Sequence, residues 1–119
     1  MSDELTQGTV FVQATLKVSG GKWKILILWH LKDHVRRFST LKRLMPEITE
    51  KMLIQQLREL EKDGIVSRNV HSEVPPKVEY AFTAYCLSLK PVLQVLCNWG
   101  ENHLKRSSLE DEQTESPLP

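Results

Sequence analysis

The stretch that most constrains the fold is the amphipathic segment from Thr49 to Gly64, TEKMLIQQLRELEKDG. At about 100° per residue, Leu53, Leu57 and Leu60 fall on one side of a helix. The other side carries polar and basic residues, namely Lys51, Gln55, Arg58 and Lys62. The pattern predicts an α-helix that packs its leucines against a core and exposes its polar face.

Both ends of this helix are signalled in the sequence. Thr49 is a suitable N-cap residue, and Glu50 next to it suits the positive end of the helix dipole. Lys62 suits the negative end, and Gly64 can take the left-handed conformation that follows many helices. We therefore expect a helix bounded by Thr49 and Gly64.

The exposed face of this helix consists of side chains that can bind DNA. Lysine, glutamine and arginine can donate hydrogen bonds to base edges and phosphates in a major groove. The segment is therefore a candidate recognition helix. An ordinary amphipathic helix with a solvated polar face has the same pattern, so the flanking sequence must distinguish the two.

Length and composition restrict the class of protein. A chain of 119 residues with 40% hydrophobic residues predicts one small domain. No apolar run of about 18 residues occurs, and the amino terminus MSDELTQGT is polar, so we expect a soluble cytoplasmic protein with no membrane partner. Two cysteines are too few for a disulfide framework and are not spaced as a zinc motif.

Charge is unevenly distributed along the chain, which has 16 basic and 15 acidic residues. Removing residues 106–119, with one arginine and four acidic residues, leaves 15 basic and 11 acidic residues, a net charge of +4. We expect a flexible segment at 1–9, a folded domain at 10–105 and a disordered acidic tail at 106–119.

The segments before the candidate recognition helix are also expected to be helical. Phe11 to Val18 predicts a short helix and Lys22 to Leu31 a buried one, and Asp33 to Arg37 is a polar connection. Phe38 to Met45 predicts a two-turn helix that Pro46 ends. This order is the layout of a helix-turn-helix.

After Gly64 the sequence pattern changes to that of strands. Ile65 to Val70 and Lys77 to Phe82 alternate with a period of two, and the loop between them contains two prolines. They predict a two-stranded wing, with Arg68 and Lys77 positioned to supply charge. The predicted fold class is α+β, mostly α: a winged helix-turn-helix with extra N- and C-terminal dimerisation helices.

A last long helix is expected from Thr83 to about Lys105, kinked at Pro91. Its apolar residues recur at spacings of four and three, as on a helix that packs on another helix. We expect a second copy of the chain to cover them, although coverage within the monomer is the alternative. The predicted dimer interface comprises Phe11, Leu16, Leu89, Val92, Leu96, Trp99 and His103.

Three other groups of residues have simple explanations. Cys86 and Cys97 lie too far apart on one predicted helix to bond to each other, so buried thiols are favoured over a disulfide between subunits. His30 and His34 have a metal-ligand spacing without further ligands nearby, so no metal is expected. The tryptophans and tyrosines favour core packing, with a small-molecule effector pocket as the alternative.

Several separated segments carry a family resemblance. They are GGKWKILIL at 20–28, Arg37-Phe38, the segment 48–68, EVPPKVEYAFT at 73–83 and LKPVLQVLCNWG at 89–100. Together they resemble the HxlR-type winged-helix family of bacterial transcriptional regulators, over about residues 10 to 104. The resemblance implies a dimeric DNA-binding regulator related to MarR-type proteins. It also implies dimerisation through the outer helices, with two recognition helices in successive major grooves of a near-palindromic operator.

Two departures from the family pattern restrict what the resemblance implies. Many members have a cysteine followed by proline before the first helix, used in some as a redox sensor, and this chain has Val10-Phe11 there. Sensing by that cysteine therefore does not carry over. Glu50 and Ile54 also stand where neutral polar residues are expected.

Two functions are consistent with the sequence. The first is sequence-specific DNA binding by a homodimer, with Lys51, Gln55 and Arg58 at base edges and Thr49, Lys62 and Arg68 nearer phosphates. Lys77 adds charge from the wing. The second is a winged-helix module that docks a protein and has lost DNA binding. No nucleophile with a base, no paired carboxylates in an apolar setting and no phosphate-binding glycine loop occur, so we expect neither an enzyme nor a cofactor.

Overall fold

The computed structural model describes residues 3–112, and the chain divides into two compact units between Ser88 and Leu89. The helices of the first unit are α1 (Asp3–Ser19), α2 (Gly21–Leu31), α3 (Phe38–Leu44) and α4 (Glu50–Lys62). Its strands are β1 (Arg36–Arg37), β2 (Val66–His71) and β3 (Lys77–Phe82). A 3-10 helix, Tyr85–Leu89, leads to α5 (Lys90–Glu112) in the second unit. The chain is thus mostly helical with a small antiparallel sheet, as predicted.

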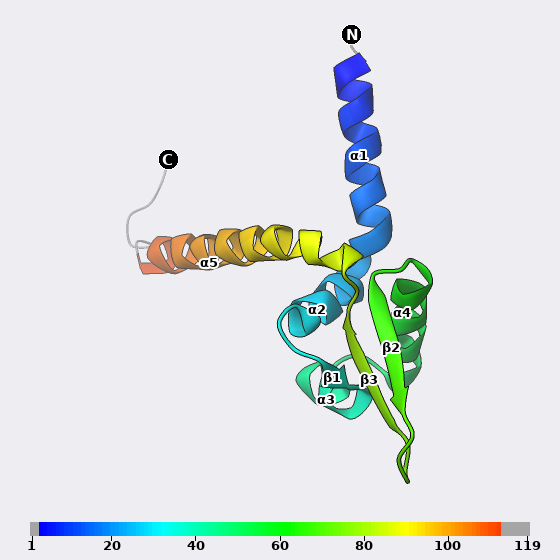
Figure 1. Cartoon of the computed structure of the whole chain (residues 1–119). Helices are drawn as coiled ribbons and strands as arrows, with labels where there is room; N and C mark the ends of the chain where they lie inside the picture. The colour runs from blue at the N-terminus through cyan, green and yellow to red at the C-terminus, as the bar shows by residue number, and fades with distance from the viewer. Residues whose placement is uncertain (1–2, 113–119) are drawn as a thin grey trace. The chain divides into compact units, whose positions relative to one another are not determined.

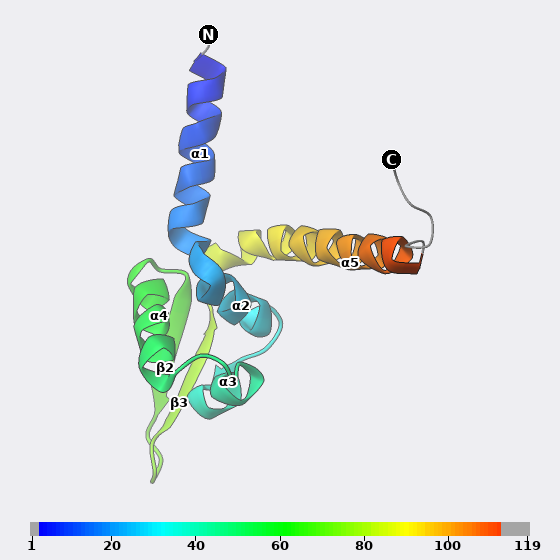
Figure 2. The same cartoon turned by 180° about the vertical axis from the view of Figure 1, so that it is seen from behind.

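Helix α2 lies at the centre of the first unit, where it contacts α1, α4 and β3. Ile27, Leu28 and Leu31 of α2 are almost completely buried, together with Leu41 of α3. In both views α4 lies beside β2, and the tip of the β2–β3 hairpin extends beyond α3 and α4 (Figures 1 and 2). Helix α4 and the hairpin are therefore held on a common core.

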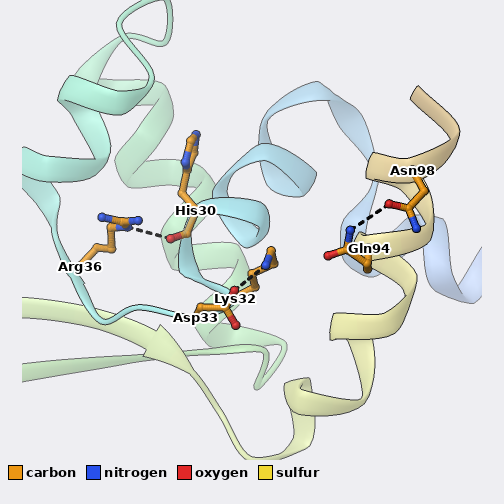
Figure 3. Close-up of polar contacts among 6 residues, drawn as sticks. All are labelled: His30, Lys32, Asp33, Arg36, Gln94 and Asn98. Atoms are coloured by element: carbon orange, nitrogen blue, oxygen red, sulfur yellow. Dashed lines mark hydrogen bonds and ion pairs between the residues drawn. The ribbon is translucent and has the colours of Figure 1, made fainter. Parts of the chain in front are cut away.

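The sheet has three strands, in the order β1-β3-β2, where the sequence predicted two. The β2–β3 hairpin is confirmed, with Val66 opposite Phe82 and His71 opposite Lys77. The additional strand is β1, which lies in the segment predicted to be a polar connection and pairs with β3. Arg36 also donates a hydrogen bond from Nε to the His30 carbonyl, at 2.8 Å (Figure 3). A strand of two residues is too short to show a periodic pattern in the sequence. Only its pairing with β3 identifies it as a strand.

The outer helices begin or end at other residues than predicted. Helix α1 includes residues 3–9, assigned to a flexible segment, and is therefore longer than the short helix expected at 11–18. Helix α5 continues through residues 106–112 of the expected acidic tail. Residues 113–119 of that tail lie outside the described part of the chain.

The start of α5 also corrects a prediction. The Thr83 hydroxyl accepts a hydrogen bond from the Cys86 N–H at 3.2 Å, so it caps the 3-10 helix and not α5. Pro91 is the second residue of α5 and not an interior residue. The first turn of a helix has N–H groups without intrahelical partners, so a proline there displaces no hydrogen bond. Pro91 therefore lies at the start of α5, where the reason for predicting a kink does not apply.

Candidate nucleic-acid interface

Helix α4 has the ends that its sequence predicts. The Thr49 hydroxyl accepts a hydrogen bond from the Met52 N–H at 3.1 Å, the N-cap arrangement. Gly64, just past the helix, has a φ of 72°, which glycine adopts without steric cost. The Thr49 cap and the Gly64 C-terminal position are both confirmed.

The orientation of α4 is fixed by its buried leucines. Leu53, Leu57 and Leu60 are at most 1% exposed. On one flank of the helix, Glu59 pairs with Lys24 of α2 at 3.2 Å, and the Lys24 side chain is only 13% exposed. These contacts leave the opposite face in solvent. Four predicted site residues are exposed on that face: Lys51, Gln55, Arg58 and Lys62.

The two basic residues predicted on the wing lie on different faces of it. Arg68 is opposite Tyr80 in the β2–β3 pairing, whereas Lys77 is opposite His71. Because side chains alternate along a strand, residues 68 and 71 on β2 point to opposite faces. Arg68 therefore shares the face of Tyr80, and Lys77 lies on the other face, which we call the outer wing face.

The outer wing face contains a small ion cluster centred on Glu79. One carboxylate oxygen of Glu79 lies 3.0 Å from Lys77 Nζ and 3.1 Å from His71 Nε2. The hydrogen bond from Lys77 holds the pKa of Glu79 below its usual value, and the charges of Lys77, His71 and Arg37 act in the same direction. Lys77 thus already has an anionic partner within the chain.

Arg58 and Arg68 are brought to one place by the fold. Both line a cavity of about 480 Å³ between α4 and the β2–β3 hairpin. The remaining lining residues are Phe38, Ile54, Leu57, Glu61, Val78 and Tyr80. Two arginines ten residues apart in the sequence thus border the same cavity, next to the exposed face of α4.

Sequence reasoning missed two residues at this site. Glu79 has no predicted role, although it follows Lys77 by two residues on a predicted strand, and that spacing already places both on one face. Ile54 stands where the family pattern predicts a neutral polar residue, and it is 38% exposed beside Arg58 and Gln55. Its exposure depends on how α4 packs, so the sequence could not supply it.

The predicted interface residues on α1 are exposed in the first unit. Phe11 is 68% exposed and Leu16 58% exposed, and their neighbours Val10 and Val12 are also more than half exposed. In both views α1 projects away from the rest of this unit (Figures 1 and 2). The helix therefore presents apolar side chains to solvent.

Helix α5 presents a similar row of apolar side chains. Trp99 is 67% exposed, Leu96 51% and Val92 43%, while Leu89 before the helix is half-buried. The ring of exposed His103 stacks on Trp99 with centroids 5.1 Å apart. A polar pair lies on the other side of the helix, where Gln94 donates a hydrogen bond to Asn98 at 3.0 Å (Figure 3).

The two cysteines differ in their environments. Cys86 is 2% exposed, and burial raises the pKa of its thiol to about 11. Cys97 is exposed, so the expectation of a buried thiol is confirmed for Cys86 and wrong for Cys97. A thiol on an outward position of α5 remains accessible to solvent, whereas Cys86 lies within the 3-10 helix.

The described residues contain neither a metal-ligand cluster nor a membrane-spanning helix. Within residues 3–112, no three or more histidine, cysteine or acidic side chains are grouped to hold a metal ion. The pKa of His30 is lowered by its burial and by the charge of Arg36. None of the described helices is long and apolar enough to span a membrane.

Comparison with known proteins identifies the family of this chain. A family model described as HxlR-like helix-turn-helix matches residues 18–108. YtcD of Bacillus subtilis, an uncharacterized HTH-type transcriptional regulator, is 58% identical over 97 residues, which cover 82% of this chain and 77% of YtcD. YkvN of the same organism, described in the same words, is 52% identical over 84% of this chain and 85% of its own.

Solved structures agree with this classification. A crystal structure of the HTH-type regulator YtcD matches with a TM-score of 0.76 and 57% identity, covering 79% of this chain and 96% of the other. The redox regulator HypR in its reduced form matches with a TM-score of 0.76 and 47% identity, covering 84% and 97%. From the family model, the relatives and the shared fold, the chain belongs to the HxlR-like helix-turn-helix family of transcriptional regulators.

Proposed function

We propose that this regulator binds DNA sequence-specifically as a cytoplasmic homodimer on a near-palindromic promoter site. The observation that carries the proposal is the polar and basic face of α4, which is exposed opposite three buried leucines. That face has the donors and charge needed in a major groove, on a helix that is rigidly held. Membership in a family of HTH-type regulators supports the same conclusion.

The proposed contacts follow from position on α4 and on the wing. Lys51, Gln55 and Arg58 face base edges, and Thr49 and Lys62 at the two helix ends contact phosphates. Arg68, which borders the same cavity as Arg58, contacts the backbone beside the groove. Lys77 reaches phosphate from the outer wing face, where DNA competes with Glu79 for its charge.

Exposed apolar residues support the homodimer part of the proposal. Phe11 and Leu16 on α1, with Val92, Leu96 and Trp99 on α5, leave large apolar groups in solvent in a single chain. A second copy would remove them from water and would set the spacing of two recognition helices near the ~34 Å repeat of B-DNA. An unidentified small-molecule effector that changed this spacing would control binding.

The DNA-binding proposal is tested by selection from a random duplex pool, followed by titration at fixed salt. We expect an enriched near-palindromic sequence that binds at least about 1000-fold more tightly than a scrambled duplex. Equal, weak and salt-sensitive binding to both duplexes would indicate only a basic surface. No binding at low salt would contradict the proposal and favour a protein-docking module.

The homodimer is tested separately with a matched pair of α5 variants. Leu96→Glu places a charge among the exposed apolar residues, whereas Asn98→Glu places the same charge on the polar side of the helix. Sedimentation should give a dimer for the wild type and Asn98→Glu, and a monomer for Leu96→Glu. A dimeric Leu96→Glu protein would show that this face of α5 is not the interface.

A further inference from the structure

Ile54 is an exposed apolar residue of α4 that the proposed base and phosphate contacts do not explain. It is 38% exposed, whereas the leucines of the same helix are at most 1% exposed. It lies three residues after Lys51 and four before Arg58, which makes all three neighbours on the helix surface. An apolar side chain therefore lies between two of the groups proposed to face DNA.

The surroundings of Ile54 place it toward the surface that would meet DNA. It borders a surface groove along α4 whose other lining residues are Glu50, Lys51, Gln55, Arg58 and Glu59. It also lines the cavity that separates α4 from Arg68 on the wing. Part of its aliphatic surface therefore faces solvent beside the donors of α4.

The chemistry of the major groove identifies a partner for such a side chain. Base edges there present hydrogen-bond donors and acceptors, and the C5-methyl group of thymine is their apolar group. A polar base edge against Ile54 would lose its hydrogen bonds to water without replacement. A thymine methyl instead gains an apolar contact.

We propose that Ile54 is a specificity residue that packs against a thymine methyl in each half-site, next to the base pair contacted by Arg58. This inference rests on the proposed DNA binding and adds the identity of one base. A β-branched isoleucine has few rotamers, so it holds its methyl groups in a fixed position. The preferred half-site therefore contains thymine at one defined position.

The test removes the methyl group from the DNA and the side chain from the protein. In the duplex selected by the wild-type protein, each thymine of one half-site is replaced in turn by uracil, which lacks only the methyl. Affinity is measured for the wild type, for Ile54→Ala and for Met52→Ala. Met52 is the matched control, because it is 37% exposed on the other flank of α4.

We expect one uracil substitution to weaken wild-type binding about fourfold, the factor for one buried methyl group. The same substitution should weaken Met52→Ala equally and leave Ile54→Ala unaffected. A wild type insensitive to every uracil, or an Ile54→Ala protein that keeps the loss, would overturn the inference while DNA binding itself stands. If the pool yields no bound sequence, DNA binding fails and the inference fails with it.

Discussion

Lys77 Nζ lies 3.0 Å from the carboxylate of Glu79, on the face of the wing opposite to Arg68. Two basic residues that the sequence assigned to the same task thus have different surroundings. Arg68 borders a cavity with Arg58, whereas Lys77 is held by an internal acidic group that His71 also contacts. The wing therefore has two electrostatically different faces.

The Glu79 cluster predicts a specific pH dependence of stability. The pKa of Glu79 is lowered in the folded chain, chiefly by the hydrogen bond from Lys77, so the ionised carboxylate stabilises the fold. That contribution is complete above the ordinary carboxyl value of about 4.3. It is lost as the pH falls through the lowered folded value.

Glu79→Gln should therefore unfold at lower denaturant than the wild type at pH 7. The difference should disappear at pH values below the folded pKa, where the wild-type carboxyl is also neutral. Urea unfolding followed by circular dichroism from pH 7 to pH 2.5 provides the measurement. Glu73→Gln makes the same charge change in the wing loop and serves as the control. A pH-independent difference between wild type and Glu79→Gln would contradict the assignment.

Two substitutions of Arg58 should show whether it contacts a base or a phosphate. Because its side chain is exposed, Arg58→Ala should leave stability within about 0.5 kcal/mol of the wild type. It should weaken binding to the selected duplex by roughly 5- to 150-fold. Arg58→Lys keeps the charge but loses the two-pronged geometry of arginine.

The lysine variant should keep the salt dependence of binding and lose preference for one base pair. Titrations against the selected duplex and single-base variants at several salt concentrations provide the measurement. Unchanged affinity of Arg58→Ala for the selected duplex would remove Arg58 from the base-contact set.

Thr49 has a structural role that precedes any contact with DNA. Its hydroxyl accepts the Met52 N–H, so Thr49→Ala should lower the free energy of unfolding by about 1 kcal/mol. Thr49→Ser keeps the hydroxyl and should remain within a few tenths of a kcal/mol of the wild type. Urea denaturation of the three proteins checks this. Equal stability of the alanine and wild-type proteins would mean that the cap contributes nothing.

The two cysteines should react at different rates. Burial raises the pKa of Cys86 to about 11, and only the thiolate reacts with iodoacetamide. At pH 8 we expect exposed Cys97 to be alkylated at least about 100-fold faster than Cys86. Peptide mass spectrometry over time gives both rates. Cys97→Ser should then label only slowly until denaturant is added, and rapid labelling of that variant would contradict burial of Cys86.

Much of the candidate site could be predicted because its determinants are local. The leucine spacing, the Thr49 cap and Gly64 all lie within or beside one helix, and each predicts its own conformation. The strands of the wing were found from their alternation for the same reason. The face shared by Lys77 and Glu79 was equally available from that alternation.

Other features depended on contacts between distant segments. Strand β1 consists of two residues and exists because β3 supplies its hydrogen-bonding partners. The cavity shared by Arg58 and Arg68 requires α4 and β2 to be placed side by side, and the exposure of Ile54 depends on the same packing.

The sequence by itself determined the helix-turn-helix, the polar face of α4 and the strands of the wing. These follow from periodicity and capping, which act over a few residues. Only the tertiary structure decided that Arg58 and Arg68 border one cavity and that Ile54 remains partly in solvent. Those outcomes follow from burial and strand pairing between segments far apart in the chain, which no local pattern encodes.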